Sequence, residues 1–393
     1  MSASLDWKRV HREATVIDLH IHPSMKQQLF NRHLGVRYFV ARTTNIFGVQ
    51  SSFPRLHSGG YDAILSVLHV PEKGLLKDFP IVNLFRILRP DLWHKLIAAP
   101  PFQATIKILE DMEAEVARTT SVPVKMAHSV KELNDILNQP GDRRPIAIIH
   151  AVEGAHSLGG DEASEDGVLR NLEELYRRGV AYITLAHFYK NRVVNPCYPY
   201  PEHLVQLAKN PDVWRDVTLG LTDLGKRVVQ RMIELGMLID LSHCTPTARQ
   251  QIYDLCDASG KKVPLIVTHV GAYEINPSPY NLQDWEIKRI ARDDGIVSAI
   301  FMNYWLMPNE TGQGLNFVSR TLEHFINVGG EDHVGLGTDF DGFADPPDDL
   351  HDATQMPRLT QRLLSDGHSE ERVKKILGGN ALRVLREGWG KKD

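Results

Sequence analysis

Short apolar runs rich in β-branched residues recur along the chain, and each has the length of one buried strand. Segments with helical periodicity lie between several of them, for example 168–178 before Gly179 and 224–235 before Gly236. A glycine just after the last apolar residue suits the end of a helix. Strands that alternate with helices predict parallel β/α units. The eight strand candidates are 15–22, 63–70, 146–153, 181–187, 237–243, 264–269, 296–302 and 333–339.

Eight such units predict an α/β fold closed into a TIM-like (β/α)8 barrel, in which strands are packed inside and covered by helices outside. The alternative is a doubly wound open sheet. That fold commonly carries a glycine-rich phosphate loop after an early strand, and no such loop follows the strand at 15–22. The barrel is therefore the predicted architecture.

The segment 71–135 is too long to be a simple connection between a strand and a helix. It contains apolar residues at helical spacing, broken by Pro90. We therefore predict a single domain over residues 1–393 with a helical insertion at about 71–135. The insertion is interpreted as a packed cover over the barrel, in preference to a membrane-surface helix or a docking site.

Charge and cysteine content narrow the functional classes. A formal net charge of -4, from 45 basic and 49 acidic residues, gives no basic excess for binding nucleic acid. Cys197, Cys244 and Cys256 form no CxxC pair, which fits a reducing compartment. Signal-peptide, membrane-span and lipid-anchor patterns are absent. We expect a cytoplasmic protein that acts on a small molecule. A homodimer is the one protein assembly that we consider.

Asp18, His20 and His22 alternate with Leu19 and Ile21 in the first predicted strand. Because side chains on a strand alternate between its faces, the polar three are expected on one face and the apolar two against the helices. Two histidines one residue apart at a strand end can bind one metal ion from the same side. Taken alone, this HxH pair is equally consistent with buried structural histidines.

Other predicted strands also end in residues of metal-ligand type. A buried structural histidine or a helix-capping acid explains any one of them, but the active site of a barrel lies where the C-terminal ends of its strands meet. So many such residues at these ends favour a metal site. The residues are Glu153, His187, His243, His269 and Asp339.

A carboxylate can bridge two cations roughly 3.5–4 Å apart, so Glu153 is the predicted bridge between two divalent metal ions. This arrangement leaves His20 and His22 for one ion and His243 and His269 for the other. Two such ions lower the pKa of a shared water and polarise a scissile carbonyl, which predicts hydrolysis by a metal-bound hydroxide.

Two further residues complete the predicted mechanism. Asp339 would accept the proton of the attacking water and return it to the leaving group. His187, neutral and not needed as a ligand, would donate a hydrogen bond to the tetrahedral oxyanion.

These residues lie in segments that resemble the membrane dipeptidase (renal dipeptidase) family, peptidase family M19 of the amidohydrolase superfamily. The resemblance spans the chain, although the insertion at 71–135 has no clear counterpart in the family. The segments are DLHIHP (18–23), AVEGAHS (151–157), YITLAHFYKN (182–191), GLTDLGKRVVQRMIELGMLIDLSH (220–243), VTHVGAY (267–273), GGEDHVGLGTDFDGF (329–343) and LGGNALRVLREG (377–388).

The resemblance implies a metallo-dipeptidase with two divalent ions, zinc by preference. It implies that His187 stabilises the transition state and that Asp339 is the general acid/base. Three further residues match family motifs: Asp18, His156 and Asp341. We assign each a structural role, behind the site or in a loop, in preference to a catalytic role. The implied metal ligands are His20, His22, Glu153, His243 and His269.

Two positions depart from the family pattern. Residue 22 is histidine where the family usually has aspartate, which removes one negative charge and favours zinc-like ions that prefer nitrogen. The segment after His269 reads SPYNL, with Tyr280 where dipeptidases carry an arginine that clamps the terminal carboxylate of the substrate. Tyrosine lacks the charged, bidentate fork of arginine. Tyr280 is the predicted substrate contact, and Lys190 or Arg192 is an alternative clamp.

Three functional hypotheses follow. The first is a dipeptidase-like hydrolase that cleaves an amide bond of a dipeptide or small amino-acid derivative. The second is a related reaction, hydrolysis of an N-acyl amino acid, an ester or a lactone, which His22 and Tyr280 favour. The third is a metal-binding or tailoring protein without peptidase activity, against which the presence of both His187 and Asp339 argues.

Overall fold

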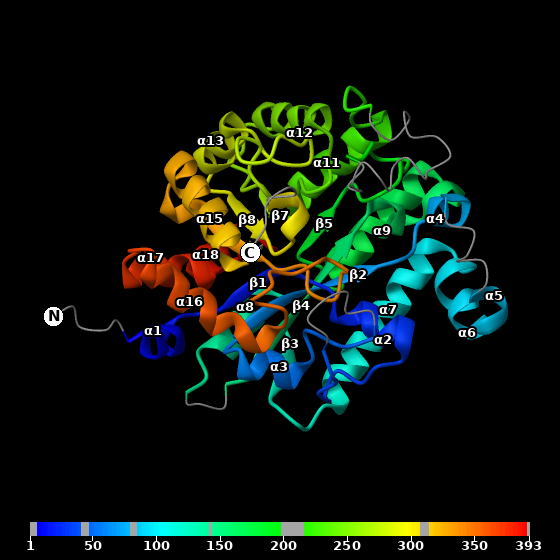
Figure 1. The fold of residues 1–393 in the computed structure, drawn as a ribbon. Helices are drawn as coiled ribbons and strands as arrows, with labels where there is room; N and C mark the ends of the chain where they lie inside the picture. The colour runs from blue at the N-terminus through cyan, green and yellow to red at the C-terminus, as the bar shows by residue number, and fades with distance from the viewer. Residues whose placement is uncertain are drawn as a thin grey trace.

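The computed structural model describes residues 6–40, 47–78, 85–140, 144–197, 216–306 and 314–390. Within these residues the chain forms a parallel sheet whose strands follow the order of the sequence, apart from one side strand. Every predicted strand is present, and Figure 1 shows the helices arranged around them. The strands of the main path are β1 (Ile17–Ile21), β2 (Ala63–His69), β4 (Ile146–Glu153), β5 (Tyr182–Thr184), β6 (Leu238–Asp240), β7 (Ile266–Val270), β8 (Ile296–Ile300) and β9 (Val334–Gly337).

The first and last strands of this path lie next to each other and bring the ends of the sheet together. The amide of Asp339, just after β9, donates to the carbonyl of His20 in β1 over 2.9 Å. The hydroxyl of Thr338 donates to the carboxylate of Asp18 over 2.6 Å. The sheet is therefore nearly closed and surrounded by helices. The prediction of a TIM-type barrel is confirmed, and the doubly wound alternative is wrong.

Strand β1 does not keep the strict alternation expected across residues 18–22. Its pairing with β2 shifts between Asp18 and Ile21. As a result Leu19 and Ile21, expected together against the helices, belong to different buried clusters. Irregular pairing of this kind re-aims side chains and is common next to active sites. The sequence pattern alone could not show it, because the shift is a property of the pairing with β2.

The two faces of β4 pack against different parts of the molecule. Ala147, Ile149 and Ala151 belong to one buried cluster, and Ile148 and Val152 belong to another that includes the apolar side of helix α7 (Pro101–Arg118). Because side chains alternate along a strand, the residue at 153 shares the face of the first set and the residue at 150 shares the face of the second.

Glycines follow the two helices where the sequence predicts them, and polar side chains cap the starts of the same helices. The side chain of Ser164 accepts an amide hydrogen at the start of α9, and Gly179 follows its end with a φ of 80°. The side chain of Thr222 accepts an amide hydrogen at the start of α11, and Gly236 follows the end of this helix with a φ of 69°. Helix α9 spans Glu165–Arg177 and α11 spans Asp223–Leu235. Besides α7, the other α-helices of the described residues are α1 (Trp7–Glu13), α2 (Pro23–Phe30), α3 (Phe53–Ser58), α4 (Lys73–Asp78), α5 (Phe85–Leu88), α6 (Pro90–Leu92), α8 (Val130–Leu137), α12 (Pro246–Ala258), α13 (Asp284–Arg292), α14 (Asn303–Leu306), α15 (Leu315–Gly329), α16 (Met356–Ser365), α17 (Glu370–Lys374) and α18 (Asn380–Gly388).

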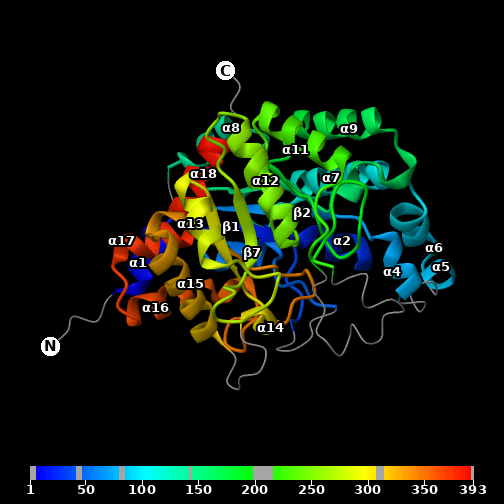
Figure 2. The same ribbon diagram turned by 90° about the horizontal axis from the view of Figure 1, so that it is seen from above.

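The segment 71–135 contains helices α4 to α7 and the start of α8, and also a short strand, β3 (Val124–Met126), that pairs with the beginning of β4. The sequence did not predict β3, since its three residues are too few to show a periodic pattern. Helices α4, α5 and α6 lie on the opposite side of the barrel from α16 and α17 (Figure 1 and Figure 2). The assignment of the chain to one domain stays a prediction.

Among the helices of the described residues, none combines the length and the apolar character that crossing a membrane requires.

Candidate metal centre

A row of side chains at the C-terminal ends of neighbouring strands forms the base of the candidate site. His69 of β2 pairs in register with Glu153 of β4, which pairs with Thr184 of β5, which pairs with Asp240 of β6. Residues paired across parallel strands present their side chains on the same face. The barrel therefore brings Glu153 together with polar groups from its neighbours, at the end where this fold places active sites.

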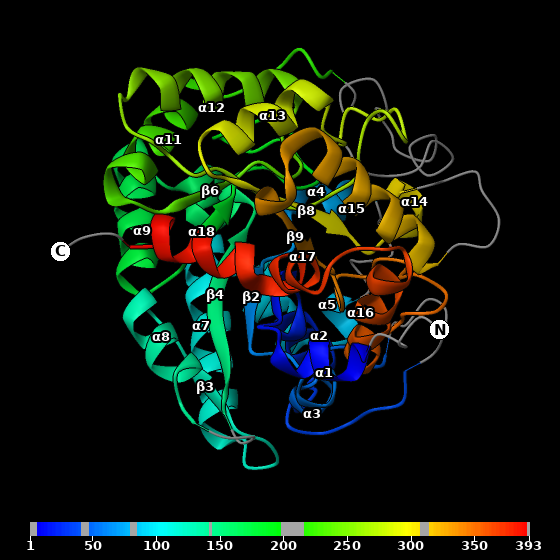
Figure 3. The same cartoon turned by 90° about the vertical axis from the view of Figure 1, so that its left-hand side faces the viewer.

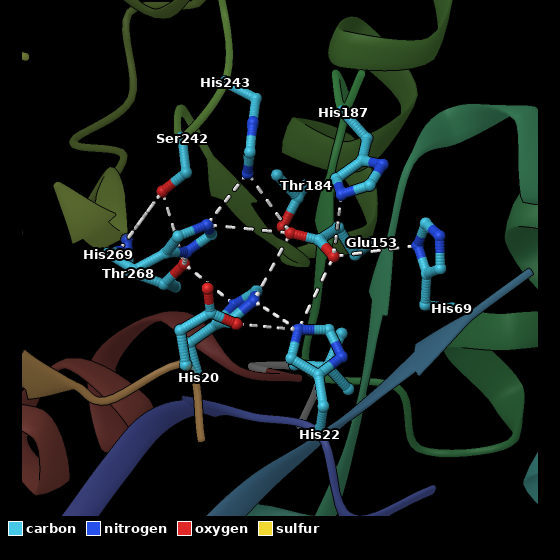
Figure 4. Close-up of polar contacts among 12 residues, drawn as sticks. His20, His22, His69, Glu153, Thr184, His187, Ser242, His243, Thr268 and His269 are labelled. Carbon is cyan, nitrogen blue, oxygen red and sulfur yellow. Dashed lines mark hydrogen bonds and ion pairs between the residues drawn. The ribbon is translucent and has the colours of Figure 1, made fainter. Parts of the chain in front are cut away.

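One carboxylate oxygen of Glu153 faces three of the predicted ligands. The distances from Oε1 to the Nε2 atoms of His20, His243 and His269 are 3.3, 3.4 and 3.6 Å. Figure 4 shows the three rings pointing at this oxygen from β1, the end of β6 and β7.

The other oxygen of Glu153 also faces three imidazoles. Oε2 lies 3.6 Å from Nε2 of His22, 3.5 Å from Nε2 of His187 and 3.6 Å from Nδ1 of His69. The carboxylate is 3% exposed, and its whole hydrogen-bonding edge is directed at imidazole nitrogens. A carboxylate in this position can bridge two cations.

The predicted ligands fall into two groups that share Glu153. One group is His20, His22 and Glu153, and the other is Glu153, His243 and His269; within each, the ligand atoms lie within 4.8 Å of one another. The Nε2 atoms of each histidine pair are 3.0 and 2.9 Å apart. Two nitrogen ligands of one tetrahedral zinc ion are about 3.4 Å apart, so the groups fit one such ion each.

Hydrogen bonds on the far side of two rings leave the Nε2 lone pairs free for a metal ion. Nδ1 of His20 lies 2.9 Å from the hydroxyl of Tyr182, which donates its own hydrogen to a backbone carbonyl of β1. Nδ1 of His269 lies 2.8 Å from the hydroxyl of Thr268, which donates to Asp240. Each hydroxyl must therefore accept the Nδ1 hydrogen, which is the arrangement found behind metal-binding histidines.

The charges in the cluster also suit a cation site. Burial alone would raise the pKa of Glu153, but the surrounding histidines, His187 and His20 foremost, hold it well below its usual value. Burial lowers the pKa of His243 and of His269, so these rings are neutral, the form that binds metal ions. Burial also opposes the charge on His20, but Glu153, Asp339 and Asp240 together outweigh burial and raise the pKa of that ring.

Asp339 lies on the loop after β9, beside the first histidine pair. Its Oδ1 is 3.2 Å from Nε2 of His22. The backbone of Asp339 has a φ of 57°, a left-handed conformation that non-glycine residues adopt mainly in constrained sites. A Cβ at Gly342 would lie 2.1 Å from Oδ1 of Asp339, so the close approach of the backbone needs a glycine there.

Glu72 and His69 are site residues that the sequence interpretation missed. Oε2 of Glu72 lies 2.7 Å from Nδ1 of His187, and its carboxylate also accepts the amides of Phe188 and Tyr189 at 3.2 and 2.9 Å. Burial would raise the pKa of Glu72, but His187, with His156 and His69, outweighs burial and holds this pKa at about 2. The signal for His69 was present, because it lies one residue before the end of the predicted strand 63–70. Glu72 lies in a loop without a pattern to mark it.

The contact with Glu72 decides which form of His187 can act as a donor. Because the carboxylate takes the Nδ1 hydrogen, a neutral ring would carry no hydrogen on Nε2. An oxyanion donor at Nε2 is therefore an imidazolium, whereas the sequence interpretation assumed a neutral ring. Burial opposes that charge, but Glu153 and Glu72 outweigh it and raise the pKa of His187.

Asp18 and Asp341, expected to support structure, have contacts of that kind. Asp18 accepts the amide of Thr338 at 3.0 Å, and Asp341 accepts the amides of Gln50 and Ser51 at 2.9 Å each. Both carboxylates thereby hold the loop after β9 or the strand beside it.

His156, the third such residue, lies close to the site. Its Nε2 is 2.8 Å from the carbonyl of Val70. Its ring centroid is 5.9 Å from that of His69, so it packs edge-on against this ring.

The family model described as membrane dipeptidase (peptidase family M19) matches residues 5–389. The chain belongs to this family. Dipeptidase tcpJ of Claviceps purpurea is 30% identical over 280 residues, covering 70% of this chain and 58% of the relative. Dipeptidase aclJ of Aspergillus oryzae is 31% identical over 242 residues, covering 61% of this chain and 51% of the relative. The chain thus spans little more than half the length of these two relatives.

Solved structures share the fold over almost the whole chain. A metallopeptidase from Rhodobacter sphaeroides, bound to a phosphinate mimic of the dipeptide L-Ala-D-Ala, has a TM-score of 0.70 at 20% identity and covers 96% of this chain and 99% of its own. The probable dipeptidase PvdM from Pseudomonas aeruginosa has a TM-score of 0.72 at 17% identity and covers 97% of each chain. At these identities the likeness establishes the architecture of the M19 chain and no more.

Tyr280 lies in the wall of this M19 site. Its hydroxyl donates to the backbone carbonyl of His269 over 2.8 Å, and its ring centroid is 5.0 Å from that of His243. In this arrangement the hydroxyl hydrogen is already engaged, so binding a carboxylate would require it to turn away from His269. Of the alternative clamps, Arg192 donates to the backbone carbonyl of Ala163. The substrate role of Tyr280 stays a prediction.

Proposed function

We propose that the chain is a two-metal hydrolase that cleaves an amide bond in a dipeptide or small amino-acid derivative. The observation that carries this proposal is the position of Glu153, with one oxygen facing His20, His243 and His269 and the other facing His22. His20 and His22 would hold one ion, and His243 and His269 the other. Four nitrogen ligands and one shared carboxylate favour zinc.

When bound, two divalent ions supply an activated water and polarise the scissile carbonyl. Asp339 then accepts a proton from the attacking water and returns it to the leaving nitrogen, for which its carboxylate beside His22 is well placed. His187 donates from Nε2 to the developing oxyanion, and Glu72 holds the ring in that orientation through Nδ1.

The names of the fungal relatives support an amide substrate, since both are dipeptidases. The engaged hydroxyl of Tyr280 favours a second candidate, a substrate without a free C-terminal carboxylate, such as a C-terminal amide, an ester or a lactone. Both candidates use the same metal centre and the same proton transfer. A cytoplasmic location and assembly as a homodimer stay predictions of the sequence.

A substrate panel tests the proposal. Zinc-loaded protein is given free L,L and L,D dipeptides, N-acyl amino acids, C-terminally amidated dipeptides, esters and lactones, with Asp339→Asn as the blank and the zinc content measured in parallel. Turnover of free dipeptides that disappears in the variant supports the first candidate. Turnover confined to the esters, amides or lactones supports the second. A fully metallated protein that hydrolyses none of them would overturn both.

A further inference from the structure

A second histidine cluster lies on the opposite face of β4 from Glu153. His150 of β4 is fully buried, and its side chain is directed away from the barrel centre because it is three residues before Glu153. Glu113 of α7 and His128, between β3 and α8, approach it from outside. Figure 3 shows β3, α7 and α8 beside β4 in this part of the molecule.

The three side chains converge on one point. Oε1 of Glu113 lies 3.2 Å from Nε2 of His128 and 3.6 Å from Nε2 of His150. The three ligand atoms lie within 4.8 Å of one another. Ligands of a tetrahedral zinc ion are about 3.4 Å apart, so the spacing fits one ion with water at the remaining position.

The buried ring of His150 lacks the partners that a structural histidine normally has. Within the described part of the chain, neither of its nitrogens makes a hydrogen bond. A buried polar nitrogen without a hydrogen bond is unfavourable, and a bound metal ion would remove this cost. Nε2 points at Oε1 of Glu113, but at 3.6 Å the contact is longer than a hydrogen bond.

The groups around this cluster resemble the surroundings of a metal site. Nδ1 of His128 lies 3.3 Å from a carboxylate oxygen of Glu132, the arrangement that orients a ligand histidine. Arg178 contacts the second oxygen of Glu113 at 3.4 Å and leaves Oε1 for the two rings. Gly179 has a φ of 80°, and a Cβ there would lie 2.6 Å from the backbone of His128, so this glycine allows His128 to reach its position.

We propose that Glu113, His128 and His150 bind a third divalent metal ion, which joins the 71–135 segment to the barrel wall. Two histidines and one carboxylate favour zinc as this ion. The ion can reach this site from solvent, because the side chain of Glu113 is 30% exposed and that of His128 is 38% exposed. Because α7 and the β3–α8 loop each contribute one ligand and β4 contributes the third, the ion would cross-link them.

Zinc stoichiometry tests this proposal. The full chain is stripped with a chelator, reloaded with Zn²⁺, freed of excess metal and measured by elemental analysis. His128→Ala and Glu113→Gln should each hold one zinc equivalent less than the wild type, while hydrolysis is unchanged. His57→Ala, a change at an exposed histidine outside both clusters, is the matched control and should hold as much zinc as the wild type. His128→Ala and Glu113→Gln alter partly exposed side chains. The test therefore does not require a substitution of the fully buried His150, which could disturb folding.

The difference between variants separates this site from the inner one. It does not depend on how many ions Glu153 and its neighbours bind, or on which substrate is cleaved. Glu132→Gln should weaken the affinity of this one zinc by roughly 10–100-fold in a chelator competition, since it removes only the partner behind His128. Equal zinc content in the wild type, His128→Ala and Glu113→Gln would overturn the proposal.

Discussion

Strand β4 carries a carboxylate–histidine cluster on each face, and the two differ in what surrounds the carboxylate. Both oxygens of Glu153 face imidazoles, and its side chain is 3% exposed. Glu113 directs one oxygen at two imidazoles, while Arg178 contacts the other. A carboxylate with both oxygens available can bridge two ions, whereas one with an arginine on its second oxygen can hold a single ion. The same residue types therefore suit different tasks.

The position along the strand adds to the contrast. Glu153 is the last residue of β4, where the loops that carry Asp339, His187 and Glu72 meet. His150 lies within the strand, covered by α7 and the β3–α8 loop. In this fold the reactive side chains lie at the C-terminal ends of the strands, whereas the outer face in the middle of a strand contacts the helices and loops that cover it. The inner cluster should control turnover, and the outer one should control how the 71–135 segment is held.

The largest expected effect comes from Glu153→Gln, compared with Glu113→Gln. Loss of the inner charge should reduce occupancy of both proposed ions and lower turnover by more than the roughly 10²–10³-fold that loss of one transition-state donor costs. Glu113→Gln, the same change on the other face, should leave turnover unchanged. Metal analysis and initial rates measure both. Full retention of two catalytic ions in Glu153→Gln would contradict its role as the bridge.

Asp339→Asn should lower kcat by roughly 10²–10⁴-fold, the usual contribution of a positioned acid or base. Metal content should stay at the wild-type level, because the predicted ligands are untouched. Rates on the best substrate of the panel and elemental analysis of the same sample measure both quantities. Unchanged turnover would remove the acid/base assignment, and lost metal would show instead that Asp339 is a ligand.

Glu72→Gln should lower kcat by roughly 10–100-fold, since the amide orients His187 less well and no longer favours its charged form. If Glu72 acts through His187, adding Glu72→Gln to His187→Ala should cost almost nothing further. Rates of the two single variants and the double variant provide the cycle. Strictly additive losses would mean that Glu72 acts independently of this ring.

Tyr280→Phe should have the smallest effect, a loss of about 1 kcal/mol of stability from the hydrogen bond to the His269 carbonyl. Denaturant unfolding measures the loss. KM for a free dipeptide and for its C-terminal amide distinguishes the substrate role. A rise in KM for the free dipeptide alone would show that Tyr280 binds the carboxylate. If KM for both substrates equals that of the wild type, the role of Tyr280 is structural.

The sequence by itself determined the barrel and the main residues of its centre. Apolar runs and the helices between them are local patterns, so they locate the strands along the chain without any knowledge of tertiary contacts. The ends of the strands meet in a barrel whatever the details of packing. The predicted ligands lie at or near these ends: His20, His22, Glu153, His243 and His269. Family membership follows from the same segments and is confirmed.

Tertiary structure decided which groups meet, because contact depends on register and on loops. His69 reaches Glu153 through the pairing of β2 with β4, and Leu19 leaves its expected face because the pairing of β1 shifts. Glu72, in the loop between β2 and α4, contacts Nδ1 of His187. The outer cluster joins residues from a helix, a loop and a strand, so no spacing in the sequence could reveal it. Local periodicity fixes what each segment becomes, but only the packed chain fixes its neighbours.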